Sequence, residues 1–261
     1  MEKREYAMKR FALICMILFC AVIFVFGGYQ LYLQLSEYAE GENTYSGLED
    51  FVALPAPSET TPKPMDEEEP IPSIAWPEVD FAELSAINPD IVGWLYCEDT
   101  VINYPVAQTD DNSYYLNHLF DGTYNANGCL FLGCRTGGDF SDPHSIIYGH
   151  HMKNGSMFSS LDGYKKQEYF DAHPQLLLVT PGSNFVIELF AGYVASVRDD
   201  AWQIQFSDEF AMEAWLEAAI EKSTFESGMA PLPADRIITL STCSYEFSNA
   251  RFVVHGILRE Y

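Results

Sequence analysis

An unbroken run of sixteen apolar residues, Phe11–Phe26, is the feature that most constrains how this chain can fold. The segment stays largely apolar to Leu35, and about 20 residues of helix are enough to cross the hydrocarbon core of a bilayer. Four basic residues precede the run, and no other basic residue follows before Lys63. By the positive-inside rule, this pattern predicts a cytoplasmic segment 1–10, a transmembrane anchor 11–35 and an extracellular remainder.

A cleaved signal peptide is the alternative interpretation of this segment. The apolar region of a signal peptide usually has 7–15 residues and is followed by a small-x-small cleavage site. The run in this chain is longer, and the sequences Gly27-Gly28-Tyr29-Gln30 and Tyr38-Ala39-Glu40 are poor sites. A single-pass anchor in the cell membrane is therefore the favoured interpretation.

An acidic, proline-rich segment, 36–77, follows the predicted anchor. It contains seven prolines and the acidic cluster Asp66-Glu67-Glu68-Glu69, which predicts an extended linker. The remaining segment, 78–261, is long enough to form one domain with a buried core. Beyond the first ten residues the chain carries 10 Lys and Arg against 36 Asp and Glu. This charge argues against nucleic acid as a partner, because phosphate backbones attract the opposite sign.

The segment 78–261 has mainly β patterns with a few helices. Short apolar or alternating runs predict strands near 92–96, 101–105, 129–132, 145–148, 176–180 and 184–197, and two more from Ile237 and Arg251. Helices are expected at 81–87 and from Ser207, with a helical turn within 112–119. The second helix carries an apolar stripe, which predicts packing against the core: Met212, Trp215, Leu216, Ala219 and Ile220.

The last two predicted strands carry the residues that point to chemistry. The strand from Ile237 ends on Cys243, and the next begins on Arg251 after a loop of seven residues. A hairpin-like return of this kind brings the thiol and the guanidinium to the same end of the sheet. A thiolate beside a fixed cation that can stabilise an oxyanion is what acyl transfer requires.

A nucleophilic cysteine also needs a base, and His150 is the best candidate among the six histidines. It follows the apolar run Ser145–Tyr148 and Gly149, which places it at a strand end. His151 would point to the opposite face of an extended backbone. His118 and His173 lie in polar, turn-like surroundings and are expected at the surface, and His255 is expected to be a half-buried strand residue.

A structural role for Cys243 is the competing interpretation. A bridge to Cys97 or to Cys134 would make the chain a disulfide-stabilised, membrane-tethered adhesion or scaffolding module. The pairing state of Cys97, Cys129 and Cys134 stays open, and Cys15 and Cys20 are expected to act as small apolar residues in the anchor. A hydrolytic cysteine peptidase is a further alternative. No Cys and His set has the spacing of a metal site, so neither a metal nor another cofactor is expected.

Several motifs together resemble the sortase family, and class B sortases in particular. They occur in the family's order over roughly residues 78–261: Ile87–Leu95, Ile102–Gln108, Tyr148–Phe158, Thr239–Phe247 and Ala250–Gly256. The resemblance implies a closed antiparallel β-barrel with peripheral α-helices, preceded by the transmembrane helix. It implies that 78–261 is the catalytic domain, with Cys243 as nucleophile, His150 as acid and base, and Arg251 as the stabiliser of the oxyanion or substrate. Asn103, Tyr104 and Tyr148 resemble positions near the substrate groove, and Ser241 and Thr242 are expected to add donors there.

The activity that the resemblance implies is cysteine transpeptidation at a Gram-positive cell surface. The enzyme would cleave a C-terminal sorting motif of a secreted protein through a thioester. It would then join the acyl group to an amine of a peptidoglycan precursor or of a pilin. The sequence leaves open the sorting motif, the amine acceptor, the choice between wall anchoring and pilus assembly, and the oligomeric state.

Overall fold

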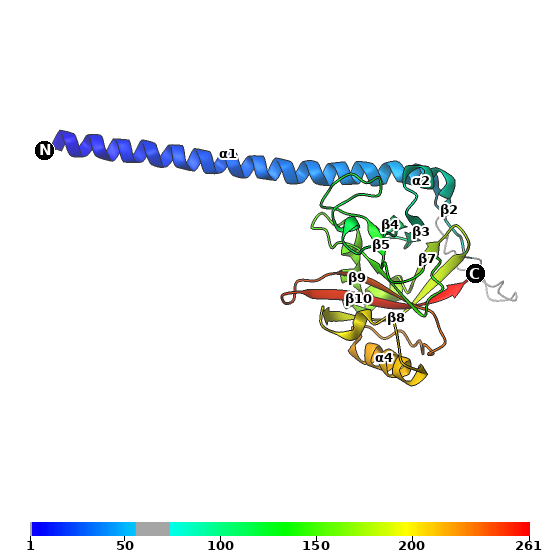
Figure 1. Cartoon of the computed structure of the whole chain (residues 1–261). Helices are drawn as coiled ribbons and strands as arrows, with labels where there is room; N and C mark the ends of the chain where they lie inside the picture. Colours follow the sequence, from blue (N-terminus) through cyan, green and yellow to red (C-terminus); the bar gives the residue numbers. More distant parts are fainter. Residues whose placement is uncertain (1, 56–73) are drawn as a thin grey trace, which may run out of the picture. The chain divides into compact units, whose positions relative to one another are not determined.

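The computed structural model describes residues 2–55 and 74–261 and divides into two compact units, at Asn43 and Thr44. Figure 1 labels most of its helices and strands. In chain order they are α1 (Glu2–Leu48), η1 (Glu49–Phe51), β1 (Val52–Ala53), β2 (Glu78–Val79), α2 (Phe81–Ile87), β3 (Ile91–Tyr96), β4 (Asn103–Ala107), η2 (Tyr114–Leu116), β5 (Leu130–Leu132), β6 (His144–Tyr148), η3 (Phe158–Lys165), α3 (Gln167–Ala172), β7 (Gln175–Val179), β8 (Asn184–Ser196), η4 (Asp200–Trp202), α4 (Glu209–Lys222), β9 (Ile237–Cys243) and β10 (Ala250–Glu260).

Helix α1 contains the predicted membrane anchor. Among the described residues, one helical stretch, Arg4–Phe51, is long and apolar enough to cross a membrane. The helix continues to Leu48, so the expectation of an extended linker is wrong for residues 36–48. The first proline of the chain is Pro55, and nothing before it interrupts the helix. Residues 56–73 of the expected linker lie outside the described part of the chain.

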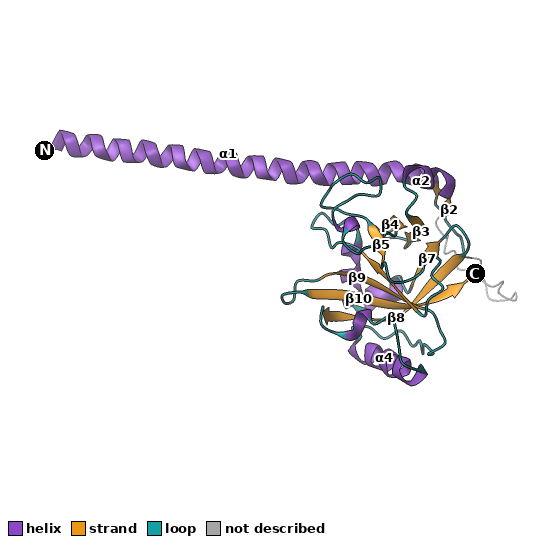
Figure 2. Ribbon diagram, in the orientation of Figure 1, coloured by secondary structure: helices purple, strands orange, loops and turns teal. Residues whose placement is uncertain are grey.

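The second unit is built on a closed barrel, as expected from the sequence. The strand order is β10-β8-β7-β3-β4-β5-β6-β9. Most neighbouring strands are antiparallel, but β4 pairs with β5 and β6 pairs with β9 in parallel. Figure 2 shows the strands of the barrel in orange with short helices outside them. The parallel pair β6–β9 matters for function, because its two strands end at the same edge of the barrel.

The two faces of the β9–β10 ribbon pack against different partners. The even-numbered residues Ile238, Leu240, Phe252 and Val254 belong to the main core of the barrel. The odd-numbered residues Ile237, Val253 and Ile257 belong to a second apolar cluster that includes α4. Successive side chains of a strand alternate between faces, so this ribbon has one face in the barrel and one face outside it.

Helix α4 covers part of that outer face. Asp208 caps the helix, and its carboxylate accepts a hydrogen bond of 2.8 Å from the Ala211 amide. The residues of the predicted stripe that are buried are Met212, Trp215, Leu216 and Ala219. The prediction is wrong for Ile220, which is 41% exposed. The helix therefore covers one end of the outer face and leaves the other end open.

Candidate active site

The parallel pair β6–β9 brings His150 and Cys243 to one edge of the barrel. Tyr148 is in register with Ser241, so each of the two residues lies two positions beyond this pair. The Gly149 amide donates a hydrogen bond of 3.1 Å to the Ser241 carbonyl, which extends the ladder by one step. A Cβ atom at Gly149 would lie 2.4 Å from a Leu130 methyl carbon, so only glycine allows this close approach.

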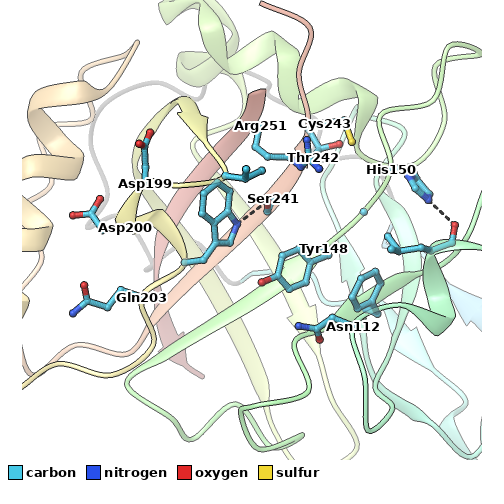
Figure 3. A pocket seen from close by; sticks show the side chains of 15 residues that line it. Asn112, Tyr148, His150, Asp199, Asp200, Gln203, Ser241, Thr242, Cys243 and Arg251 are labelled. Carbon is cyan, nitrogen blue, oxygen red and sulfur yellow. Dashed lines mark hydrogen bonds between the residues drawn. The ribbon is translucent and has the colours of Figure 1, made fainter. Parts of the chain in front are cut away.

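Arg251 reaches the same edge from the other side of β9. It lies directly opposite Cys243 in the antiparallel β9–β10 ladder. Side chains of directly opposed residues share a face of the sheet, with Cβ atoms about 5 Å apart. Figure 3 shows the Cys243 sulfur beside the Arg251 side chain, with His150 beyond the sulfur. The three predicted catalytic residues therefore meet, although His150 and Cys243 are far apart in the sequence.

A backbone carbonyl fixes the orientation of the His150 ring. Its Nε2 atom lies 2.7 Å from the carbonyl oxygen of Leu116, as the dashed line in Figure 3 indicates. A carbonyl can only accept a hydrogen bond, so Nε2 carries a proton. Nδ1 is then the ring nitrogen that remains to exchange a proton with the Cys243 thiol.

The surroundings change the pKa values of both groups in the directions that favour an ion pair. The His150 imidazole, as a hydrogen-bond partner, lowers the pKa of the Cys243 thiol against the opposing effect of burial, and the Arg251 charge lowers it further. The Cys243 sulfur raises the pKa of His150 above its usual value, again against the effect of burial. A thiolate beside an imidazolium is a more reactive nucleophile than a neutral thiol at neutral pH.

These residues line a groove of about 670 Å³. Asp199, Asp200 and Gln203 lie across the groove from Cys243 in Figure 3. Trp202 belongs to the same wall, and its indole Nε1 donates a hydrogen bond of 3.0 Å to the Ser241 hydroxyl. The groove is large enough to hold a peptide segment against the sulfur.

The predicted substrate-binding residues divide into two groups. Tyr148, Ser241 and Thr242 line the groove. Asn103 and Tyr104 are not among the lining residues. The Asn103 amide bonds to Trp94 Nε1 at 2.8 Å and to Glu49 at 3.1 Å, and Tyr104 is 9% exposed. The resemblance to class B sortases predicted that both residues lie near the groove. In the structure, however, their contacts are those of packing residues.

One wall of the groove, formed by Asp199, Asp200, Trp202 and Gln203, was not predicted from the sequence. It follows β8, whose residues Ala195 and Ser196 pair with Arg251 and Ala250. The chain therefore leaves β8 beside Arg251, and the Val197 amide donates to the Asn249 carbonyl at 3.3 Å. Only the pairing of β8 with β10 brings this wall to the site, and no local sequence signal indicates that pairing.

The other histidines and cysteines take structural positions. His255 is fully buried, so the expectation of a half-buried residue is wrong. His151 pairs with Asp162 at 3.3 Å and does not line the groove. All six cysteines carry free thiols, and Cys97 and Cys129 are buried. Within residues 2–55 and 74–261, no group of His, Cys, Asp and Glu side chains is arranged to hold a metal ion.

Comparison with known proteins identifies close relatives. No protein-family model matches the chain. The sortase B of Listeria monocytogenes is 35% identical over 181 residues, which are 69% of this chain and 74% of that protein. The Staphylococcus aureus sortase B–substrate complex superposes with a TM-score of 0.66 and 30% identity, over 69% of this chain and 84% of that one. A sortase B complexed with triglycine gives a TM-score of 0.65 and 30% identity, over 69% and 85%.

Proposed function

Because the chain belongs to the class B sortase family and is a cysteine transpeptidase, we propose that Cys243, His150 and Arg251 carry out its acyl transfer. The single observation that supports this assignment best is their meeting at one edge of the barrel. Cys243 is opposite Arg251 in the β9–β10 ladder, and it shares the end of the parallel β6–β9 pair with His150. The alternative function, a disulfide-stabilised adhesion module, required Cys243 to form a disulfide, but Cys243 is a free thiol.

The first half-reaction forms a thioester. The Cys243 thiolate attacks a backbone carbonyl carbon in the sorting motif of a secreted protein, and the carbonyl oxygen becomes an oxyanion. The Arg251 guanidinium, with its planar set of donors, stabilises this charge. The C–N bond then breaks, and the proton on the His150 imidazolium passes to the departing amine nitrogen.

The second half-reaction releases the product. An acceptor amine attacks the thioester carbonyl, and the neutral His150 imidazole removes a proton from the amine nitrogen. The C–S bond breaks and the Cys243 thiolate is restored. The acceptor is an amine of a peptidoglycan precursor or of a pilin, and the crystallised complex of a sortase B with triglycine supports an amine acceptor.

The proposed location is the outer face of the cell membrane. The apolar part of α1, residues 11–35, would anchor the enzyme there, with residues 1–10 in the cytoplasm and the barrel outside. Ser241, Thr242 and Tyr148 line the groove and are the proposed contacts of the sorting motif.

The experiment that tests this function uses the full-length enzyme in detergent micelles. It is incubated with a library of sorting peptides, with and without an added amine such as triglycine. We expect a covalent adduct on the Cys243 peptide, detected by mass spectrometry, and a ligated product when the amine is present. Hydrolysed product alone, in the presence of saturating amine, would favour the cysteine peptidase instead.

A further inference from the structure

Tyr45 connects the end of helix α1 to the barrel. It belongs to the same compact unit as the barrel and is only 7% exposed. Its hydroxyl donates a hydrogen bond to the backbone carbonyl of Gly128. Its ring stands edge-on to that of Tyr104, with the ring centroids 5.2 Å apart. Tyr45 therefore makes one polar and one aromatic contact.

The polar contact, at Gly128, lies next to the His150 side chain. Gly128 has a φ of +60°, and a Cβ atom there would lie 3.0 Å from Cδ2 of His150 and 2.4 Å from the Tyr115 carbonyl oxygen. The amide of Cys129, the next residue, donates to the same Tyr115 carbonyl at 2.9 Å. The adjacent carbonyl, that of Leu116, accepts the hydrogen bond from His150 Nε2. The segment held by Tyr45 thus supports the edge of the imidazole that contains Cδ2 and Nε2.

The aromatic contact, with Tyr104, is connected to the backbone of His150 through two hydrogen bonds. The Tyr104 hydroxyl accepts a hydrogen bond of 3.2 Å from the Met157 amide. The amide of Phe158, the following residue, donates a hydrogen bond of 2.9 Å to the His150 carbonyl. Tyr104 therefore joins Tyr45 to the turn that fixes the main chain of His150.

We propose that Tyr45 is a positioning residue, which holds the His150 imidazole in place through Gly128 and through Tyr104. The inference rests on the proposed function, in which His150 exchanges protons with Cys243 and the substrate. Tyr45 does not line the groove, so it acts through the histidine and not on the substrate. A residue at the end of the N-terminal helix thereby sets the geometry of a group on the barrel edge.

The test is the Tyr45→Phe variant of the full-length enzyme in detergent micelles. The variant keeps the aromatic contact and loses the donor to the Gly128 carbonyl. We expect kcat to fall about tenfold with KM unchanged, since a small displacement of an acid–base group is costly. We also expect alkylation of Cys243 by iodoacetamide to shift to higher pH, because a displaced imidazole stabilises the thiolate less well. Alkylation is measured on the Cys243 peptide by mass spectrometry, which excludes the other five cysteines.

Tyr164→Phe is the matched control. Tyr164 is 1% exposed, and its hydroxyl donates to the His173 carbonyl at 2.8 Å, away from the groove. We expect this variant to lose a similar amount of thermal stability with no change in kcat or in the alkylation profile. Equal behaviour of the two variants in all three measurements would overturn the proposal.

Tyr104→Phe keeps the test decisive if Tyr45→Phe fails to fold. It retains the ring contact with Tyr45 and loses the acceptor for the Met157 amide. A smaller shift of the alkylation profile in the same direction supports the proposal, and an unchanged profile refutes it. An inactive Cys243→Ala enzyme together with a fully active Tyr45→Phe enzyme would remove this inference and leave the proposed function standing.

Discussion

Two imidazole sites with opposite properties lie along strand β9. At the open end, His150 lies beside Cys243 and the groove, and the thiol raises the pKa of the imidazole. At the end covered by α4, His255 lies opposite Thr239 and is fully buried. Burial lowers the pKa of the neighbouring His144 to about 4, and it lowers the pKa of His255 well below its usual value.

The hydrogen bonds of the covered site fix which ring nitrogens carry protons. His144 Nδ1 lies 2.7 Å from the Gln203 carbonyl and therefore carries the proton of the neutral ring. Its Nε2 accepts the Thr239 hydroxyl at 2.6 Å, and the Thr239 oxygen accepts from His255 Nδ1 at 2.7 Å. His255 Nε2 is left unprotonated and, within the described residues, without a partner.

The hydrogen-bond partner of a histidine and its burial therefore decide whether it can exchange a proton. Two neutral imidazoles that share one hydroxyl beneath α4 keep their protons fixed at neutral pH. An imidazole that faces a thiol at an open groove can gain and lose a proton there.

Replacing the nucleophile is expected to have the largest effect. Cys243→Ala should lower transpeptidation by about 10³-fold or more, because no other group in the site can form a thioester. The measurement is product formation from a sorting peptide and an amine, with circular dichroism to confirm folding. Cys134→Ala is the matched control, since Cys134 is another half-buried free thiol that does not line the groove. Normal turnover by Cys243→Ala would exclude the mechanism.

Replacing the cation is expected to have the second largest effect. Arg251→Lys keeps the charge and loses the planar donors, so kcat should fall about 10²-fold. Arg259→Lys is a control on the same strand, because Arg259 pairs with Asp235 and Glu188 outside the groove. Steady-state kinetics check both variants. Equal kcat values for wild type and Arg251→Lys would show that a point charge is sufficient.

The open site should respond to removal of its imidazole. His150 lowers the pKa of Cys243, so wild-type thiolate persists to lower pH than in an ordinary cysteine. His150→Ala should raise the pKa of the thiol, and the smaller thiolate fraction should slow alkylation at neutral pH by roughly tenfold. The pH dependence of iodoacetamide labelling on the Cys243 peptide measures this change. His151→Ala should leave the profile unchanged, and an identical profile for His150→Ala would contradict the assigned pair.

The covered site should affect stability rather than chemistry. The folded pKa of His144, about 4, is below the unfolded value of about 6.5, so the unfolded state binds protons first as the pH falls. The stability contributed by the neutral ring is present above pH 6.5 and is lost toward pH 4, on the order of 3 kcal/mol.

Thermal unfolding between pH 7 and pH 4 measures this loss. His144→Gln retains a side-chain amide donor for the Gln203 carbonyl, and it should flatten the acid limb of the Tm curve. If the wild-type and variant curves fall in parallel, His144 does not contribute to the acid sensitivity. Activity at neutral pH should change by no more than a few-fold, because the group does not titrate there.

Local patterns predicted most of the strands and the two helices that were expected at 81–87 and from Ser207. Alternation and apolar runs report directly on burial, and an acidic cap marks the start of α4. Local sequence patterns gave the wrong prediction for residues 36–48, where polar composition suggested an extended linker. Tyr45 and Leu48 are buried against the barrel unit there, and tertiary contacts of this kind are invisible to local composition.

The local sequence was enough to predict the long apolar helix, the strand that ends on Cys243 and the strand that carries Arg251. These follow from hydrophobicity and from short spacings along the chain. Tertiary packing set how the predicted imidazole meets the thiol, which wall faces it across the groove, and that Gly128, held by Tyr45, lies next to His150. Those relations depend on the register of β6 with β9 and of β8 with β10, which is set by packing between residues distant in the chain.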